Sequence, residues 1–313
     1  MNKKIILYYF LIALIVIISI TDSSDAALTA KFDVDKTLAF WTPERIKNAK
    51  PLISKNIEFR NKTRNDTRNV KITDDVGQQQ LVMQPFDNPN NPVNYPVGIL
   101  FFSNPETGKQ YSCTASMINT ENGNIGITAA HCLFNDNGVE FDNVVFSPGY
   151  NSKAPGPLGF IPVENIVASP GFNGAPDYDY GFIRMGFNDP NGFKLQQYTG
   201  ANGWRLNVEG DNILTTIFGY PEDGDTPNCP NDGFHLCAFV GNVKTSGTLY
   251  VIPGVDIGTG ASGAPMIFNY DISRNLGYMY STYATYFGRA KQSESPRYNP
   301  VEFNNLLEYV SNN

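Results

Sequence analysis

The stretch Gly126-Ile-Thr-Ala-Ala-His131-Cys132 holds one of only two histidines in a chain of 313 residues. Ile127 and Thr128 are β-branched and favour a strand, so we expect His131 where that strand ends. An imidazole at a strand end can reach a cleft and take part in proton transfer there. The alternative interpretation is a core histidine that bonds only to backbone groups.

The N-terminus has the pattern of a secretion signal. Lys3 and Lys4 precede an apolar run over 5–20, and the small residues of Ser24-Asp25-Ala26 follow it. We therefore predict a signal peptide over 1–26 and a secreted protein. A membrane anchor is the alternative, but the run is shorter than the roughly 20 apolar residues that span a bilayer. We expect no stable membrane insertion once the signal is removed.

Charge divides the chain into a basic first part and an acidic remainder. Residues 1–71 carry 13 of the 23 Lys and Arg but 7 of the 30 Asp and Glu, so their net charge is +6 against −13 for 72–313. An acidic body repels polyanions, which makes nucleic acid an unexpected partner.

The basic, polar stretch at 45–71 is predicted to be removable. It offers exposed arginines for cleavage, and it holds glycosylation sequons that begin at Asn61 and Asn65. We predict a propeptide over 27–69, cleavage between Arg64 and Val70, and a catalytic domain over 70–313. The alternative is a solvated, charged linker with no part in activation.

Four cysteines in a secreted chain predict two disulfides, which we assign as Cys113 to Cys132 and Cys229 to Cys237. The chain has no C-x-x-C pair, and with two histidines a four-ligand zinc site would consume most of this set. We therefore predict no metal site and no cofactor.

From Tyr95 onward, short apolar runs alternate with clusters of Gly, Pro, Asn and Asp, as in PVGILFF, YSCTASMI, DNVVFSPG, NILTTIFGY and GYMYSTYATY. This spacing predicts an all-β fold of antiparallel strands, most simply as closed barrels. One helix is predicted at the end, with Asn299 as its cap, Pro300 in its first turn and an apolar face toward the last barrel. The residues of that face are Phe303, Leu306, Leu307 and Val310.

A serine lies inside the glycine-rich run Gly258-Thr-Gly-Ala-Ser262-Gly-Ala-Pro265. Glycines permit a tight turn that exposes a hydroxyl and aims backbone N–H groups at one point. Ser262 is thus a candidate nucleophile, and the amides of Gly260 and Ser262 are candidates for an oxyanion hole. The alternative is an ordinary glycine-rich loop.

Asp179 is the candidate for the carboxylate that orients His131. It opens the predicted strand Asp179-Tyr-Gly-Phe-Ile-Arg-Met185, where an acid can lie near a barrel interior and be held by hydrogen bonds. Asp177 is the nearby competitor, and we prefer Asp179 because it adjoins the predicted strand directly.

The chain order of these groups is His131, Asp179, Ser262, and this order distinguishes nucleophilic folds. An α/β-hydrolase needs a histidine after its serine, and none follows Ser262 in this sequence. A subtilisin-like enzyme would need an aspartate ahead of the histidine in a different glycine and serine context. Neither alternative fits.

The segments ITAAHC, the strand-initial Asp179 and GASGAP resemble the three signature segments of the chymotrypsin-like serine proteases. IFGYPED at 217–223 and the stretch 250–265 are similar to the glutamyl endopeptidase branch. The resemblance implies two antiparallel six-stranded β-barrels and peptide hydrolysis. It also implies His131 as base and then acid, Asp179 as its orienter and Ser262 as nucleophile.

Two features depart from that family. Animal digestive members have an aspartate before the serine that pairs with the new N-terminus, whereas this chain has Ala261. The second histidine, His235, lies inside the predicted Cys229 to Cys237 loop, away from His131, and we expect it at the surface.

The sequence thus predicts a serine endopeptidase made as a zymogen, whose partners are protein or peptide substrates and protein inhibitors. The alternative is a catalytically inactive homologue that uses the same double barrel to bind proteins.

The predicted substrate pocket involves Asp256, Ser281 and Tyr283. Asp256 lies six positions before Ser262, the spacing at which trypsins place a pocket carboxylate, so it favours basic residues before the scissile bond. The alternative is that Asp256 is turned away and satisfies loop amides. Tyr283 falls where trypsins keep a glycine, and it could narrow or close the pocket.

Overall fold

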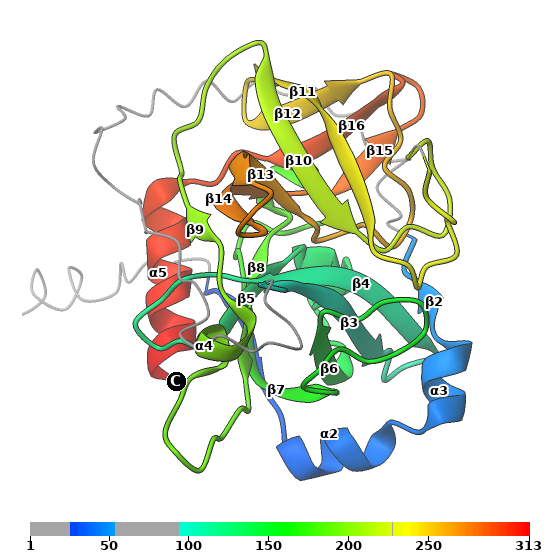
Figure 1. Ribbon diagram of the computed structural model, residues 1–313, viewed down its shortest axis with the longest axis vertical. Coiled ribbons are helices and arrows are strands. Elements are labelled where there is room, and N and C mark those ends of the chain that lie inside the picture. The colour runs from blue at the N-terminus through cyan, green and yellow to red at the C-terminus, as the bar shows by residue number, and fades with distance from the viewer. Residues whose placement is uncertain (1–25, 54–93, 227) are drawn as a thin grey trace, which may run out of the picture.

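The computed structural model describes residues 26–53, 94–226 and 228–313. Two β-structured halves are stacked one on the other, and a C-terminal helix lies along one side (Figure 1). None of the helices in these ranges has the length and apolar character needed to cross a bilayer. The predicted signal peptide, both sequons and the predicted cleavage site lie outside the described residues.

The first half is a closed barrel of six antiparallel strands. Its order is β7-β6-β3-β4-β5-β8, and pairing of β7 with β8 closes it. Closure fixes the register of each strand. The strands are β3 (Val97–Ser103), β4 (Gln110–Met117), β5 (Ile125–Thr128), β6 (Asp142–Pro148), β7 (Ile161–Ala168) and β8 (Gly181–Met185).

The second half is a curved sheet of order β15-β16-β12-β11-β10-β13-β14-β9. Its two sides approach each other where Ser281 Oγ, on β14, donates a hydrogen bond of 2.7 Å to the carbonyl of Pro296 on β16. The strands are β9 (Gly203–Trp204), β10 (Ile213–Gly219), β11 (Cys237–Ser246), β12 (Leu249–Pro253), β13 (Pro265–Asp271), β14 (Leu276–Thr282), β15 (Thr285–Phe287) and β16 (Gln292–Pro296).

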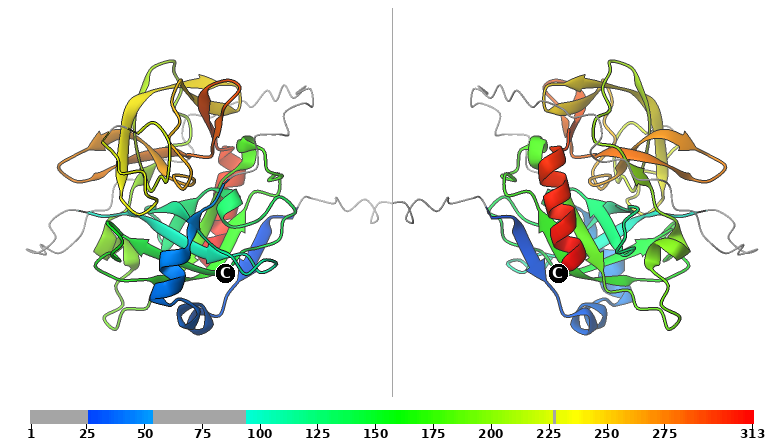
Figure 2. Two further views of the ribbon diagram at one scale, coloured as in Figure 1. Left: turned by 90° about the vertical axis from the view of Figure 1, so that its right-hand side faces the viewer. Right: turned by 90° about the vertical axis from the view of Figure 1, so that its left-hand side faces the viewer.

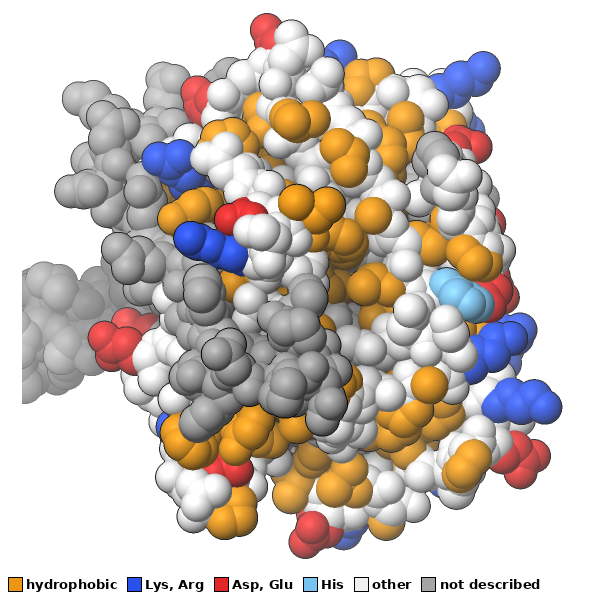
Figure 3. Space-filling view, in the orientation of Figure 1, with side chains coloured by type: hydrophobic (Ala, Val, Ile, Leu, Met, Phe, Trp, Pro, Cys, Tyr) orange, Lys and Arg blue, Asp and Glu red, His pale blue; other side chains and the backbone are white. Residues whose placement is uncertain are grey.

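This architecture confirms the predicted all-β, chymotrypsin-like fold class with its C-terminal helix. Both predicted disulfides, Cys113–Cys132 and Cys229–Cys237, are also present. The short helix α4 (Leu195–Thr199) lies in the connection between the two halves. On the face shown in Figure 3, apolar side chains occupy much of the middle and charged side chains lie mainly around the rim.

The C-terminal helix α5 (Pro300–Asn312) begins as predicted, because the Asn299 side chain accepts hydrogen bonds from the amides of Val301 and Glu302. The prediction that it packs on the last barrel is incomplete, because Phe303 contacts Trp204 of β9 in the second half but the helix lies mainly on the first barrel. The helix packs against β7 and β8 of the first barrel (Figure 2). The rings of Phe303 and Phe182 lie 4.9 Å apart. An apolar face predicts burial but does not identify the surface that covers it. Phe303, Leu306 and Val310 are buried, and Leu307 is partly buried.

The described part of the predicted propeptide is folded onto the first barrel. It consists of β1 (Leu28–Lys31), α2 (Val34–Phe40), α3 (Pro43–Asn48) and β2 (Lys50–Pro51). Strand β1 pairs antiparallel with β7, and β2 pairs parallel with β4 between the two halves (Figure 1). Residues 26–53 are therefore an ordered layer on the first barrel.

Candidate active site

His131 and Asp179 are brought together by two short 3₁₀ turns at one end of the first barrel. His131 lies in the turn Ala130–Cys132 that follows β5, and Asp179 follows the turn Pro176–Tyr178 that precedes β8. Strands β5 and β8 are paired, so their connected turns lie side by side. His131 and Asp179 are 48 positions apart in the sequence, and this arrangement brings their side chains within hydrogen-bonding distance.

The Asp179 carboxylate holds the histidine at two points. Oδ1 accepts the backbone N–H of His131 at 2.9 Å, and Oδ2 lies 2.7 Å from Nδ1 of the ring. Both side chains are buried, with Asp179 fully enclosed. An ionised carboxylate only accepts hydrogen bonds, so this pair places the ring proton on Nδ1 and leaves Nε2 as an acceptor. Within the described residues, Nε2 has no hydrogen-bond partner.

Asp177 is not at the histidine. Its carboxylate accepts a hydrogen bond from Thr248 Oγ1 of the second half. Of the two acids that the sequence offered as orienters of His131, the structure brings Asp179 to the imidazole.

Ser262 lies beside the residue that follows His131. Its carbonyl accepts the N–H of Thr114 on β4 at 2.8 Å and is 3.9 Å from Cys132 Sγ. The Cys113–Cys132 disulfide joins β4 to the histidine turn, so the same bridge connects the surroundings of both groups. Ser262 is 4% exposed, a burial typical of a residue at the bottom of a cleft or in the core.

The two candidate oxyanion amides are oriented by the carbonyls of their own peptide groups. The carbonyl of Thr259 accepts the N–H of Glu222, and the carbonyl of Ala261 accepts the N–H of Ala264, each at 2.8 Å. In a trans peptide the N–H points opposite to the C=O, so the amides of Gly260 and Ser262 face away from these bonds. Neither amide donates a hydrogen bond within the part of the chain that the structure describes.

Gly260 must be a glycine for two reasons. Its φ of +94° disfavours residues with a Cβ. A Cβ there would also lie 2.5 Å from the carbonyl oxygen of Tyr220. The glycine-rich run is thus required by the shape of this turn.

Thr114 supports the turn, and sequence reasoning missed it. Its Oγ1 donates to the Gly260 carbonyl at 2.9 Å and accepts the N–H of Tyr220 at 3.2 Å. The two hydrogen bonds attach the loop of the second half to β4 of the first. Thr114 and Gly260 are 146 residues apart, and a single threonine within a strand carries no sequence signal for such a role.

The three predicted pocket residues differ in their surroundings. Asp256 is half-buried, its Oδ1 accepts the N–H of Gly258 at 2.9 Å, and desolvation raises the pKa of its carboxyl. Ser281 is buried and bonded to Pro296. Tyr283 is 2% exposed; burial raises the pKa of its phenol, which also contacts Ser293 and Asp256.

Tyr283 thus fills the space between the end of β14 and the loop that carries Asp256. The bond from Gly258 matches the alternative in which Asp256 satisfies loop amides. The carboxylates of Asp223 and Asp225 lie near enough to raise the pKa of Asp256 further, so this corner of the molecule is strongly acidic.

The remaining candidate groups lie elsewhere or are already bonded. His235 Nδ1 pairs with Asp232 at 2.9 Å inside the Cys229–Cys237 loop. Among the described residues, the group with metal-ligand proximity is Cys113, His131 and Cys132. Both of its cysteines are in the disulfide and have no thiolate to offer.

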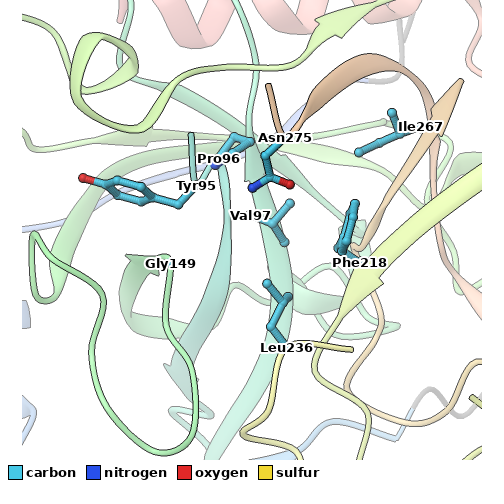
Figure 4. Close-up of a pocket in the computed structure, with 8 residues that line it drawn as sticks. All are labelled: Tyr95, Pro96, Val97, Gly149, Phe218, Leu236, Ile267 and Asn275. Atoms are coloured by element: carbon cyan, nitrogen blue, oxygen red, sulfur yellow. The ribbon is translucent and has the colours of Figure 1, made fainter. Parts of the chain in front are cut away.

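A small cavity of about 40 Å³ lies between the two halves, lined by apolar groups that include Val97, Phe218 and Ile267 (Figure 4). None of the candidate site residues lines it, so we assign it no role in the chemistry.

Three solved structures resemble this fold. The protease Anisep from Arthrobacter nicotinovorans superposes with a TM-score of 0.58 at 24% identity, over 74% of this chain and 99% of its own. The thermostable serine protease AL20 from an extremophilic microorganism also gives 0.58, at 23% identity over 70% and 99%. A Glu endopeptidase gives 0.53, at 18% identity over 76% and 98%.

Neither the scan against family models nor the search of curated proteins finds a match. The structural likeness, at these identities, concerns the fold. The match extends along almost the full length of each neighbour. The chain therefore has the fold of the chymotrypsin-like serine proteases.

Proposed function

We propose that this protein is a serine endopeptidase that hydrolyses peptide bonds through an acyl-enzyme intermediate. One observation carries the proposal: a buried carboxylate holds His131 with its Nδ1 occupied and its Nε2 unpartnered, and the next residue, Cys132, lies against the backbone of Ser262. This is the arrangement that a general base needs before it accepts a proton from a serine hydroxyl.

In the proposed mechanism, His131 Nε2 takes the proton of Ser262 Oγ as that oxygen attacks the substrate carbonyl. The negative charge that develops on the carbonyl oxygen is stabilised by the N–H groups of Gly260 and Ser262. His131 then protonates the leaving amine, and a water molecule repeats the sequence to hydrolyse the ester. Asp179 stabilises the imidazolium that forms in each half-reaction.

The preoriented amides favour this mechanism over simple binding. Their own carbonyls are bonded to Glu222 and Ala264, so the loop does not have to reorganise when charge develops. Protein and peptide chains are the proposed substrates, and protein inhibitors are proposed partners of the same cleft. The three structural neighbours bear the names of proteases, which supports the same class of reaction.

We further propose that the enzyme is secreted as a glycosylated zymogen. The signal-like N-terminus, the two sequons and the two disulfides support this part of the proposal. Cleavage between Arg64 and Val70 is the predicted processing step. N-terminal sequencing of the active form tests it, and a start upstream of Arg45 would contradict it.

The competing function is a non-catalytic protein-binding module with the same fold. A fluorophosphonate probe on the processed protein separates the two, because it forms a bond only with an activated serine. We expect labelling at Ser262, accompanied by peptide hydrolysis. A folded, processed sample that fails to label would favour the binding module.

A further inference from the structure

The end of the N-terminal segment lies against the candidate oxyanion loop. Pro51 is buried, and a Cβ placed on Gly260 would be 3.0 Å from Pro51 Cβ. A Cβ placed on Gly233 would be 2.9 Å from Pro51 Cγ. The proline ring is therefore wedged between two loops of the second half, and one of them carries the proposed oxyanion amides.

A backbone hydrogen bond also joins this segment to β4, close to the candidate active site. The N–H of Leu52 donates to the carbonyl of Ser112 on β4 at 3.0 Å, and Pro51 is paired with Ser112 in parallel register. Ser112 precedes Cys113, which is bridged to the residue after His131. Extended peptides bind by adding to a strand edge such as this one. Here the edge is already taken by the chain itself.

Residues 26–53 have their own attachments to the rest of the protein. Strand β1 pairs with β7 over four residues, and Trp41 Nε1 donates to the carbonyl of Asn143 at 2.6 Å. Ala49 is 1% exposed in a cluster with Tyr150 and Tyr220. These contacts are non-covalent and spread along the segment, so a cut in the chain after residue 53 leaves all of them in place.

An ion pair between Lys50 and Glu222 adds to the contact of this segment with the candidate oxyanion loop. Lys50 Nζ lies 3.7 Å from Glu222, whose own N–H holds the carbonyl of Thr259 in the oxyanion loop. Both side chains are exposed, so the pair contributes little to binding energy. The ion pair matters because of its position, since it places the basic end of the segment on the loop that orients Gly260. The net positive charge of residues 1–71 and the net negative charge of residues 72–313 also attract each other.

We propose that residues 26–53 are an inhibitor of the protease domain, in cis before processing and in trans after it. The inference rests on the proposed function. Pro51 and Leu52 cover the surface beside Gly260 and Ser112 that a peptide substrate must cross to present its carbonyl to Ser262. Cleavage between Arg64 and Val70 then does not by itself open the site. Activity appears only when the cut segment dissociates or is degraded.

The first experiment uses the full chain with a recognition sequence for a specific protease placed at 62–68, before and after cutting. We expect the two fragments to elute together in size exclusion at micromolar concentration. The rate of fluorophosphonate labelling at Ser262 should rise when the cut sample is diluted. A labelling rate that is equal before and after cutting at every dilution overturns the proposal.

The second experiment compares Pro51→Gly with Ile53→Ala in the uncut chain. Ile53 is 67% exposed, so its substitution leaves the wedge intact and serves as the matched control. Removing the buried ring should raise the labelling rate about tenfold, the factor that corresponds to about 1.4 kcal/mol. Ile53→Ala should change it less than about twofold. Equal rates for both variants and the parent overturn the proposal.

A third measurement covers the case in which Pro51→Gly does not fold. A synthetic peptide of residues 45–53 is added to the diluted, cut protein, with the same peptide carrying Gly at position 51 as control. We expect the parent peptide alone to slow labelling, and no effect of either peptide counts against the inhibitor. Absence of labelling in every form, cut or uncut, instead overturns the proposed function and the inference with it.

Discussion

The two halves of the molecule hold their parts of the candidate site in different ways. The first barrel is closed, and it carries His131 and Asp179 on paired strands with two hydrogen bonds between them. The second half carries Ser262 on a loop whose three glycines, at 258, 260 and 263, all have positive φ. The base is thus held by its own half, whereas the nucleophile's loop is braced from outside, by Thr114 of the first barrel.

This difference indicates where the site is rigid and where it can be altered. A closed barrel fixes strand register, so the His131 to Asp179 contact follows from the fold itself. The serine loop has no such frame, and its shape depends on glycine conformations and on the hydrogen bonds that Thr114 of β4 donates to the carbonyls of Gly260 and Ser262. Changes at the His131–Asp179 pair should therefore affect the chemistry sharply, and changes to the residues that support the serine loop should lower the activity by smaller amounts.

The largest effect is expected where the two halves meet. Ser262→Ala and His131→Ala should each lower kcat by about 10⁶-fold, with little further loss in the double variant because the groups act as a unit. Peptide hydrolysis, with thermal melting as a check of folding, measures this. Substantial turnover in either single variant would refute the assignment.

The next effect tests the first half alone. Asp179→Asn should lower kcat by about 10⁴-fold, because an amide in this position stabilises the wrong tautomer of His131. Asp177→Asn is the matched control, since Asp177 is bonded to Thr248 instead, and it should change kcat less than about threefold. The measurement is the ratio of the kcat losses in the two variants, and similar losses would contradict the role of Asp179.

Stability tests which face of the C-terminal helix is buried against the two halves. Phe303→Ala should lower the free energy of unfolding by about 3–5 kcal/mol, because the ring is fully buried against Phe182 and Trp204. Val301→Ala, at a side chain that is 70% exposed, should change it by less than about 0.5 kcal/mol. Denaturant unfolding compares the two, and equal losses would mean that the helix face is assigned wrongly.

Loss of the two Thr114 hydrogen bonds that join the halves should have an intermediate effect on activity. Thr114→Val keeps the shape of the side chain but leaves the Gly260 carbonyl and the Tyr220 N–H without their partner, which costs about 1–3 kcal/mol. We expect kcat to fall about 10- to 100-fold as the oxyanion amides lose their orientation. Thr216→Val, at a buried threonine of β10, is the control. An unchanged kcat with lowered stability would show that Thr114 supports folding alone.

The smallest effect concerns the acidic corner of the second half. The preference for basic over acidic residues before the scissile bond stays a prediction, and Tyr283 and the Gly258 amide already contact Asp256. We therefore expect attraction by the clustered charge rather than a direct pair. Asp256→Asn should reduce the preference about two- to fivefold, and salt should reduce it too. Profiling on a mixed peptide library measures it, and dominant cleavage after Glu would overturn the prediction.

Local signals in the sequence were sufficient for several features. Alternating apolar runs predicted the strands of both halves, and Asn299 with Pro300 predicted the start of α5. The order and surroundings of His131, Asp179 and Ser262 predicted a site that the structure assembles in part at hydrogen-bonding distance. Strands β1, β2, β9 and β16 were not predicted, since segments of two to five residues are too short to establish a period.

By itself, the sequence determined the strand pattern and the residue types that can transfer protons, because each depends on neighbours a few positions away. Only the tertiary structure decided the surface that α5 covers, the support of Gly260 by Thr114 and the place of Pro51 beside the candidate site. Those contacts join residues that are tens to hundreds of positions apart. They depend on how two β-structured halves pack, and no local pattern of amino acids encodes that packing.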